Sequence, residues 1–448
     1  MTNIASLILP AVAEIGATAE GKNMDKAVAS VIETPSAPFA FLRGQQNDKP
    51  SAFTFFEFFA GGGMARAGLG AGWKCLFAND FDFKKSATYK ENWGEKTLLT
   101  KDVRTVTPDE LPGQPDLIWA SFPCQDLSLA GMGAGLKGDR SGTFWPFWRL
   151  VKELDNRNRG PRVIVLENVC GTLTSHGGKD FAAIADALAE SGYKFGALVV
   201  DAINFVPQSR PRLFIVATKA EIDIHPNLFG AEASLTLHPK SLRLAHTQLS
   251  EEAKRNWVWW RLPLPGPRNT KFANLIEENP QSVSWHSTAE TTKLLDMMSD
   301  GNLEKVRAAK RTKQKLVGAV YKRTRFDDDD EKVQRAEIRF DDVAGCLRTA
   351  AGGSSRQLIV VVEGNSVRSR LLSTREAARL MGLGDEYKLP KNYNEAYHLM
   401  GDGVVVPVVR HLAANLLEPL LSNDKMRANP ENAGGHSLRE KSRAAKAN

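Results

Sequence analysis

A cysteine, a glutamate and an arginine stand where apolar runs of this chain begin or end. Cys124 lies in a Pro-Cys-Gln turn after the run Leu117–Ala120, Glu167 closes another run as Glu-Asn-Val, and Arg212 ends a Gln-x-Arg-x-Arg sequence. A thiolate is a soft nucleophile, a carboxyl group can donate a proton, and a guanidinium can hold an oxygen atom. Together these residues could carry out covalent catalysis.

Each of these residues also has an ordinary structural interpretation. Cys124 could be a small core residue, although a turn of Pro, Cys, Gln and Ser is a poor place to bury a side chain. Glu167 could form a salt bridge at a strand end, and arginines flanked by proline most often lie on the surface. A free cysteine has a pKa near ~8.5, so a nucleophilic Cys124 would need a positive neighbour such as Arg210 or Arg212.

A glycine-rich turn, Phe59-Ala60-Gly61-Gly62-Gly63, follows a further apolar run. With a helix from about Met64, it would let a ligand approach the backbone at the carboxyl edge of a sheet. Asp80, nineteen residues after Gly61, could accept two ribose hydroxyls or cap a helix over 83–92. Asp102 could accept from an adenine amino group or cap a turn. Such turns serve many nucleotides, so the turn alone identifies none.

The elements that would position these residues follow an alternating pattern. Helix-like stretches, such as residues 180–191, separate short apolar runs at 53–59, 74–78, 116–120, 162–166, 196–200 and 213–217. This alternation predicts an α/β fold with a doubly wound, mostly parallel sheet. Because Phe205–Val216 contains two prolines, we expect a loop that leads into an edge strand there.

The C-terminal part shows helix signals again. Ser373 and Glu376 form a capping box that would open a helix over 371–381. Gly401-Asp402-Gly403 then leads into a closing helix over 404–417.

These patterns divide the chain into five parts. We expect a loosely ordered extension over 1–50, an α/β domain over 51–218, a second, smaller domain or large insertion over 219–365, a return to the first domain over 366–421, and a disordered basic tail over 422–448. The three tryptophans Trp257, Trp259 and Trp260 could stack on nucleic acid, but such a cluster is more often the core of a small domain.

Composition narrows the class of protein. The 448 residues include 42% hydrophobic and 25% charged residues, enough for two ordinary globular cores, and a net charge of +7 suits a polyanionic partner. The four cysteines form no CxxC pair, which indicates neither a zinc site nor a disulfide framework. The segment Ile4–Ile15 lacks a basic start and carries Glu14, and no later run looks long enough to span a bilayer. We therefore expect a cytoplasmic protein that is not bound to a membrane.

The four motifs, in this order, resemble those of the cytosine-C5 DNA methyltransferase family over most of residues 53–420. The resemblance implies a Rossmann-like fold that binds S-adenosylmethionine and releases S-adenosylhomocysteine. The positions expected at the cofactor are Phe59, Ala60, Gly61, Gly63, Asp80, Phe81, Asp102, Val103, Ser121, Pro123 and Asp402. Three positions depart from the family pattern: Glu57 replaces an Asp, Met64 replaces a Gly, and Asp402 replaces an Asn.

The resemblance also implies a mechanism. Cytosine C5 is a weak nucleophile, so Cys124 adds to C6, Glu167 protonates N3, and Arg212 holds O2, with Gln208 and Arg210 in support. Because C6 is closed to a thiolate inside the stack, the cytosine would be flipped out of duplex DNA. No metal is expected.

The second domain would read the target sequence. Nine Lys or Arg and no acid lie between Lys305 and Arg325, a strip suited to phosphates, although an acidic run follows and a solvated helix face is the alternative. A loop around Gly352-Gly353 could approach bases closely. The expected DNA contacts are Lys310, Arg311, Lys313, Lys315, Lys322, Arg323, Arg325, Ser354, Ser355, Arg356 and Gln357.

Two other functions fit the same motifs. One is a tRNA cytosine-C5 methyltransferase, for which the region 219–365 is larger than needed. The other is a catalytically silent DNA-binding relative, against which the presence of Cys124, Glu167 and Arg212 argues. Amino-group methyltransferases need an Asn/Asp/Ser-Pro-Pro-Tyr/Phe motif, and the chain has none. We expect a monomer, with a restriction endonuclease as a separately encoded companion and the nucleoid as the site of action.

Overall fold

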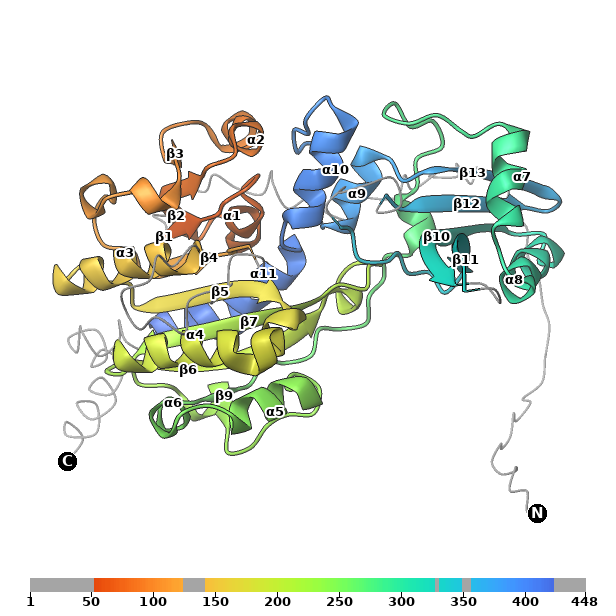
Figure 1. Cartoon of the computed structure of the whole chain (residues 1–448). Helices are drawn as coiled ribbons and strands as arrows, with labels where there is room; N and C mark the ends of the chain where they lie inside the picture. Colours follow the sequence, from red (N-terminus) through yellow and green to blue (C-terminus); the bar gives the residue numbers. More distant parts are fainter. Residues whose placement is uncertain (1–51, 124–141, 327–329, 349–355, 423–448) are drawn as a thin grey trace, which may run out of the picture. The chain divides into compact units, whose positions relative to one another are not determined.

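A seven-stranded sheet organises most of the protein (Figure 1). The structure, a computed structural model, describes residues 52–123, 142–326, 330–348 and 356–422. In spatial order the strands are β3 (Leu98–Thr100), β2 (Trp73–Asp80), β1 (Phe53–Phe58), β4 (Leu117–Ala120), β5 (Val163–Val169), β7 (Pro211–Lys219) and β6 (Tyr193–Asp201). Only β7 runs antiparallel to its neighbours, which confirms the predicted α/β fold with a mostly parallel sheet.

Helices cover both faces of this sheet (Figure 1). One face packs against α1 (Met64–Leu69), α2 (Phe83–Trp93) and α11 (Val406–Leu412), and the other against α3 (Phe144–Asn156), α4 (Lys179–Glu190), α5 (Lys240–Thr247) and α6 (Glu251–Arg255). Every residue of β4 is therefore buried, which explains its unbroken apolar sequence.

A second, antiparallel sheet has the order β11 (Lys332–Arg339), β10 (Lys315–Phe326), β12 (Leu358–Glu363) and β13 (Ser366–Leu371). Its buried face packs against α7 (Thr288–Asp296) and α8 (Asp300–Arg311). The sheet extends past residue 365 to the end of β13, after which α9 (Thr374–Leu380) and α10 (Tyr393–Asp402) follow.

The tryptophan cluster packs against the large sheet. A short ladder joins β8 (Phe229–Gly230) to β9 (Trp259–Trp260), and Trp260 Nε1 donates to the carbonyl oxygen of Val216 at 3.0 Å. Trp257 contacts the rings of Phe181 and Phe195. The cluster is thus a core, as the commoner interpretation held, but the core is that of the first sheet and not of a small domain.

One sequence expectation about elements was wrong, and two others needed their bounds adjusted. β7 is not an edge strand, because it pairs with β5 on one side and β6 on the other, and Pro211 is tolerated as its first residue. The capping box at Ser373 is confirmed, but its helix begins only at Thr374 because β13 continues to Leu371. Gly401 and Asp402 form the last turn of α10, and the expected closing helix follows, beginning at Val406.

The expectation about membrane-spanning length was also wrong. The helical stretch Tyr393–Ser422, which contains α10 and α11, is long and apolar enough by length and composition to cross a bilayer. Within the described ranges, however, 61% of its apolar window is buried inside the protein, as in a core helix.

Candidate active site

The glycine turn after β1 is held by side chains from distant parts of the chain. Phe59, Gly61 and Gly63 all have positive φ angles, of 57°, 54° and 78°. Trp93 and Tyr387 both donate hydrogen bonds to the carbonyl oxygen of Gly62, at 2.9 and 2.7 Å. Because a methyl group at position 62 would lie 2.2 Å from the Tyr387 hydroxyl, only glycine fits there.

Asp80 fixes this turn to the next strand. Its carboxylate accepts hydrogen bonds from the backbone N–H groups of Gly61 and Asp82, at 2.8 and 2.9 Å. The N-cap of α2 is Asp82 and not Asp80, so the capping alternative for Asp80 was wrong. Burial raises the pKa of Asp80 against the lowering effect of its hydrogen bonds, and the remaining acceptor capacity of its carboxylate faces a cavity.

This cavity, of about 740 Å³, joins the ends of β1, β2, β4 and β5. Its lining brings together most of the residues expected at a cofactor and at a reacting base: Phe59, Ala60, Gly61, Asp80, Phe81, Ser121, Pro123, Glu167, Arg212 and Asp402. Cys124 lies outside the described residues, but the residue before it, Pro123, is part of the lining. A cavity of this size suits a drug-sized or nucleotide-sized ligand.

Glu167 and Arg212 form an ion pair in the wall of the cavity, with Nε and Oε1 3.3 Å apart. The antiparallel pairing of β7 with β5 causes this, because it aligns Arg212 with Val169 beside the end of β5. Burial raises the pKa of Glu167, against the lowering effects of Arg212, of Arg210 and of a hydrogen bond with Ser121. A carboxyl group with such a pKa can act as a proton donor.

Asn168 ties β5 to the segment that leads to Cys124. Its Nδ2 donates to the carbonyl oxygen of Phe122 at 3.0 Å, and its Oδ1 accepts from the Val169 N–H. Trp119 Nε1 donates to Ser121 Oγ at 3.0 Å, which steadies the same segment. Sequence reasoning treated Asn168 only as part of a motif. Its amide, which can donate and accept at once, was the signal for this role.

Comparisons with known proteins agree with this geometry. A profile of the family described as C-5 cytosine-specific DNA methylase matches residues 53–418. The chain belongs to the C-5 cytosine-specific DNA methylase family.

Individual relatives cover most of this methylase. It is 27% identical to the type II methyltransferase M.BsuFI of Bacillus subtilis over 380 residues. The aligned region covers 84% of this chain and 75% of M.BsuFI. The methylase is 25% identical to the type II methyltransferase M.HhaI of Haemophilus parahaemolyticus, over 81% of this chain and 93% of the relative. The solved Entamoeba histolytica methyltransferase EhMeth is 15% identical and shares the fold, with a TM-score of 0.53 over 82% of this chain and 98% of the other.

The side chains of Gln208 and Arg210 form hydrogen bonds with backbone groups and are not among the described residues that line the first cavity. The Arg210 guanidinium is buried and donates to the carbonyl oxygens of Leu347, Gly401 and Gly403, at 2.7 to 2.8 Å. Gln208 donates to Leu380 and accepts from the Leu347 N–H. Burial lowers the pKa of Arg210 to about 10. Both residues join β7 to later parts of the chain, which is a positioning role.

Asp102 and Val103 are not brought to the cavity. Asp102 caps a short 3-10 turn and pairs with Arg104 at 2.6 Å, which lowers its pKa through the hydrogen bond. Val103 is buried in the core beneath α3. Gly63 is the N-cap of α1. Asp402 forms an ion pair with Lys85 at 2.6 Å, and both residues line the cavity. Sequence reasoning did not identify Lys85.

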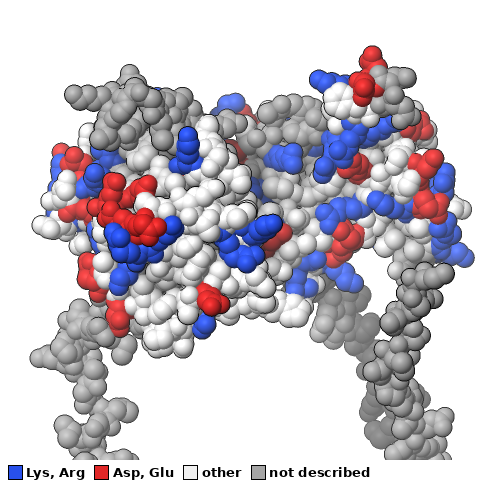
Figure 2. Space-filling model, turned by 60° about the horizontal axis from the view of Figure 1, so that its bottom comes forward, with Lys and Arg blue, Asp and Glu red and all other residues white. Residues whose placement is uncertain are grey.

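The predicted basic strip does not form one surface. Lys310, Arg311 and Lys313 lie at the end of α8, whereas Lys322, Arg323 and Arg325 lie toward the far end of β10. Several of these side chains already have acidic partners: Arg311 pairs with Glu304, Lys315 with Glu278, and Arg323 and Arg325 with Glu337. On the face shown in Figure 2, Lys and Arg are likewise interspersed with Asp and Glu. Ser354 and Ser355 lie outside the described residues.

Part of the strip lies, with basic residues from other segments, around a second cavity of about 540 Å³. Its described lining includes six Lys or Arg and a single acid, Glu337; the basic residues are Lys305, Lys322, Arg323, Arg339, Arg348 and Arg356. Cys346 and Arg348 line both cavities. Sequence reasoning missed Arg339 and Arg348, because the strands that bring them together are distant in sequence.

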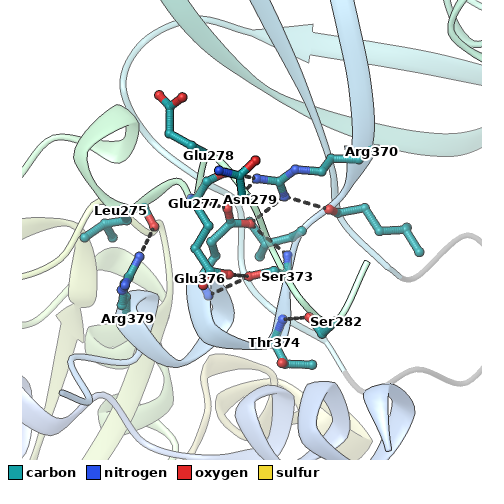
Figure 3. A network of polar contacts seen from close by, with 12 residues as sticks. Leu275, Glu277, Glu278, Asn279, Ser282, Arg370, Ser373, Thr374, Glu376 and Arg379 are labelled. Atoms are coloured by element: carbon teal, nitrogen blue, oxygen red, sulfur yellow. Dashed lines mark hydrogen bonds and ion pairs between the residues drawn. The ribbon is translucent and has the colours of Figure 1, made fainter. Parts of the chain in front are cut away.

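A buried ion pair anchors the second sheet to α9 (Figure 3). Arg370, on β13, donates to both carboxylate oxygens of Glu376 at 2.6 and 2.8 Å, and both side chains are fully buried. The Nη1 and Nη2 groups of Arg370 also donate to the carbonyl oxygens of Leu371 and Glu277. Glu376 also completes the cap of α9 through the Ser373 N–H. One pair therefore joins a strand, a helix start and a connecting segment.

Proposed function

We propose that this methylase transfers a methyl group from S-adenosylmethionine to C5 of a cytosine flipped out of a specific sequence of duplex DNA. The observation that carries the proposal is the Glu167–Arg212 pair in the wall of the cavity that also contains the glycine turn and Asp80. A proton donor, an oxygen-binding guanidinium and a nucleotide-binding turn thus share one space. Pro123 brings the chain to this space immediately before Cys124.

The residues of the cavity fit S-adenosylmethionine. Asp80 has acceptor capacity for ribose hydroxyls, Phe81 offers an exposed ring beside it, and the Gly61–Gly63 turn leaves room for close approach. Glu57, buried at the same wall, has a carboxyl oxygen without a hydrogen-bond partner among the described residues. When bound, S-adenosylmethionine supplies an electrophilic methyl group.

The protein's own groups then act in sequence. The thiolate of Cys124 forms a bond to C6, while Glu167 gives its proton to N3 and Arg212 holds O2. This makes C5 electron-rich. After C5 gains the methyl group, its proton passes to a water molecule, the electrons of that bond re-form the C5–C6 double bond, and the bond between C6 and the sulfur breaks to release the Cys124 thiolate. N3 returns its proton to Glu167. Asn168 holds the backbone before Cys124 in place throughout.

A role in restriction and modification follows from the relatives M.BsuFI and M.HhaI, which are both named type II methyltransferases. A separately encoded restriction endonuclease would then share the recognition sequence. An orphan modification methylase is the second form of the same function. In either case we propose a monomer that acts on the nucleoid in the cytoplasm.

The experiment that tests the function offers labelled S-adenosylmethionine with duplex DNA of mixed sequence and, in parallel, with tRNA, followed by bisulfite sequencing. We expect label only on cytosines within one short DNA motif. Label on tRNA alone would instead make the enzyme an RNA methyltransferase. Label on neither would favour a silent DNA-binding relative.

A further inference from the structure

An ion pair joins α2 to α10, and these two helices lie side by side (Figure 1). Lys85 Nζ on α2 lies 2.6 Å from Oδ2 of Asp402, the last residue of α10. At the other end of α2, Asn92 binds the backbone of Lys388 through two hydrogen bonds, at 2.8 and 3.0 Å. The C-terminal end of α2 is therefore fixed to the segment before α10 by an amide, whereas charges hold its N-terminal end to α10.

Between the two helices lies a cavity of about 750 Å³, which we call the outer cavity. Its lining comes from residues within 81–88, at the start of α2, and within 390–399, before and inside α10. Phe83 belongs to this lining and is 79% exposed, so the outer cavity opens to solvent. A second ion pair, Lys84 with Glu395 at 2.8 Å, lies in the same wall.

The outer cavity adjoins the catalytic cavity, which contains the glycine turn, Asp80 and Glu167. Four of the described residues line both spaces: Phe81, Lys85, His398 and Leu399. A molecule that moves from the outer cavity to Asp80 must therefore pass between these side chains. Asp402 lines the catalytic cavity, so its ion pair with Lys85 joins the two sides of this boundary.

The catalytic cavity meets the second cavity elsewhere, at Cys346 and Arg348. The basic residues around the second cavity suit the DNA of the proposed function. Among the described residues, no side chain lines both the outer and the second cavity. The outer cavity therefore gives a small ligand a path to the glycine turn that does not cross the second cavity.

We propose that the cofactor enters and leaves through the outer cavity, and that the Lys85–Asp402 ion pair is the latch that holds this passage closed. This inference rests on the proposed function and adds the control of cofactor exchange. The exposed fractions of the two side chains, 22% and 34%, are those of a surface pair. Such a pair stabilises a closed form only slightly, so it opens readily, as a passage used in every turnover requires. The family pattern has Asn at position 402, which could not form the ion pair.

The first test uses the unaltered full-length enzyme, with S-adenosylhomocysteine as the probe. This molecule carries one ammonium and one carboxylate near neutral pH, so it has no net charge and salt has little effect on its approach. Stopped-flow tryptophan fluorescence measures its association and dissociation rate constants. Because salt screens the latch, both rate constants should rise when salt is raised from about 0.05 M to about 0.5 M. Rate constants that do not change with salt would contradict the proposal.

Variants then assign the effect to the ion pair. Lys85→Met and Asp402→Asn should each raise both rate constants by about 1.5- to 5-fold, because a weaker latch opens more often whether or not the cofactor is bound. The ratio of the two rate constants, which is the dissociation constant, should change little. The double variant should resemble the single variants, since either change alone removes the pair. Its rate constants should also lose most of their dependence on salt.

Lys101→Met is the matched control. It breaks an ion pair with Glu110 in which the two side chains are 34% and 33% exposed, and neither residue is among the described lining of the three cavities. Both rate constants should stay unchanged. If Lys85→Met raised only the dissociation rate constant and weakened binding, Lys85 would be a direct cofactor ligand and the latch would be wrong. Unchanged rate constants in both Lys85→Met and Asp402→Asn would contradict the latch equally.

The two proposals fail in different ways. If the unaltered enzyme does not bind S-adenosylhomocysteine, the proposed function and the latch both fall. If it methylates DNA but exchanges this molecule at rates that do not depend on Lys85 and Asp402, the function stands and only the latch is lost.

Discussion

Asn168 donates a hydrogen bond to the carbonyl oxygen of Phe122, two residues before Cys124, at 3.0 Å. The bond links the strand that carries Glu167 to the backbone that carries the proposed nucleophile. This amide therefore ties the end of β5 to the described segment that precedes Cys124.

Replacing this amide tests the link. In Asn168→Asp the donor is lost and a carboxylate faces the Phe122 carbonyl, so we expect kcat to fall by about 10- to 100-fold through misplacement of Cys124. Calorimetric affinity for S-adenosylmethionine should be unchanged. The exposed Asn227→Asp is the matched control. A variant with normal kcat would show that Cys124 is positioned by other contacts.

The proposed nucleophile is tested by Cys124→Ser. A serine hydroxyl is ionised far less readily than a thiol and adds poorly to a soft acceptor, so methylation should be abolished while DNA binding stays largely intact. Filter-based methyl transfer and gel-shift binding measure the two properties. Cys75→Ser, a buried position away from both cavities, should keep activity. Near-normal turnover of Cys124→Ser would refute the covalent mechanism.

The raised pKa of Glu167 predicts a pH profile. Its acid form must donate the proton, so single-turnover rates should decline as pH rises through this pKa, while the thiolate of Cys124 is lost at low pH. The result is a bell-shaped curve. Glu167→Gln cannot give up a proton and should be slower by about 10² to 10⁴, with a flattened alkaline limb. An unchanged alkaline limb would assign the decline to another group.

Glu57 predicts how stability changes with pH. Burial raises its pKa to about 8, so between pH 4.5 and 8 the folded protein holds a proton that the unfolded chain releases. Stability therefore falls as pH rises through this window. The side chain of Glu57→Gln stays neutral at every pH. At pH 8 the free energy of unfolding of this variant should therefore exceed that of the unaltered protein by up to about a few kcal/mol, and below pH 4.5 it should not. Urea unfolding at several pH values measures this, with exposed Glu91→Gln as control.

Breaking the buried Arg370–Glu376 pair should destabilise the second sheet. Arg370→Met leaves a buried carboxylate without its cation, at a cost of about 3–5 kcal/mol, and adding Glu376→Gln should restore part of it. Trp285, whose ring lies 4.7 Å from the Arg370 guanidinium, provides a fluorescence signal. Asp385→Asn, in an exposed pair with Arg379, should cost less than about 1 kcal/mol. If Arg370→Met and Asp385→Asn lowered the free energy of unfolding by the same amount, this interpretation would be wrong.

Local sequence signals predicted the fold and much of the site. The apolar runs gave the central strands, and the turn at Gly61 and the acid at Asp80 meet at one cavity because parallel strands share an edge. They did not predict the place of β7, since prolines report on local backbone geometry and not on which strand pairs with which. Local signals also failed to place Arg339 and Arg348 beside the basic strip. The second cavity is lined by several strands that are distant in sequence, so no local pattern marks it.

The buried contacts of Arg210 have a consequence for the newly made protein. Its guanidinium binds the backbone of Gly401 and Gly403, and residues 398–404 complete the wall of the catalytic cavity. On the ribosome, Cys124 and Glu167 emerge long before these residues are made. A chain that stops before residue 398 would carry the proposed catalytic groups without this part of the cavity wall. The proposed activity would therefore require translation past residue 404.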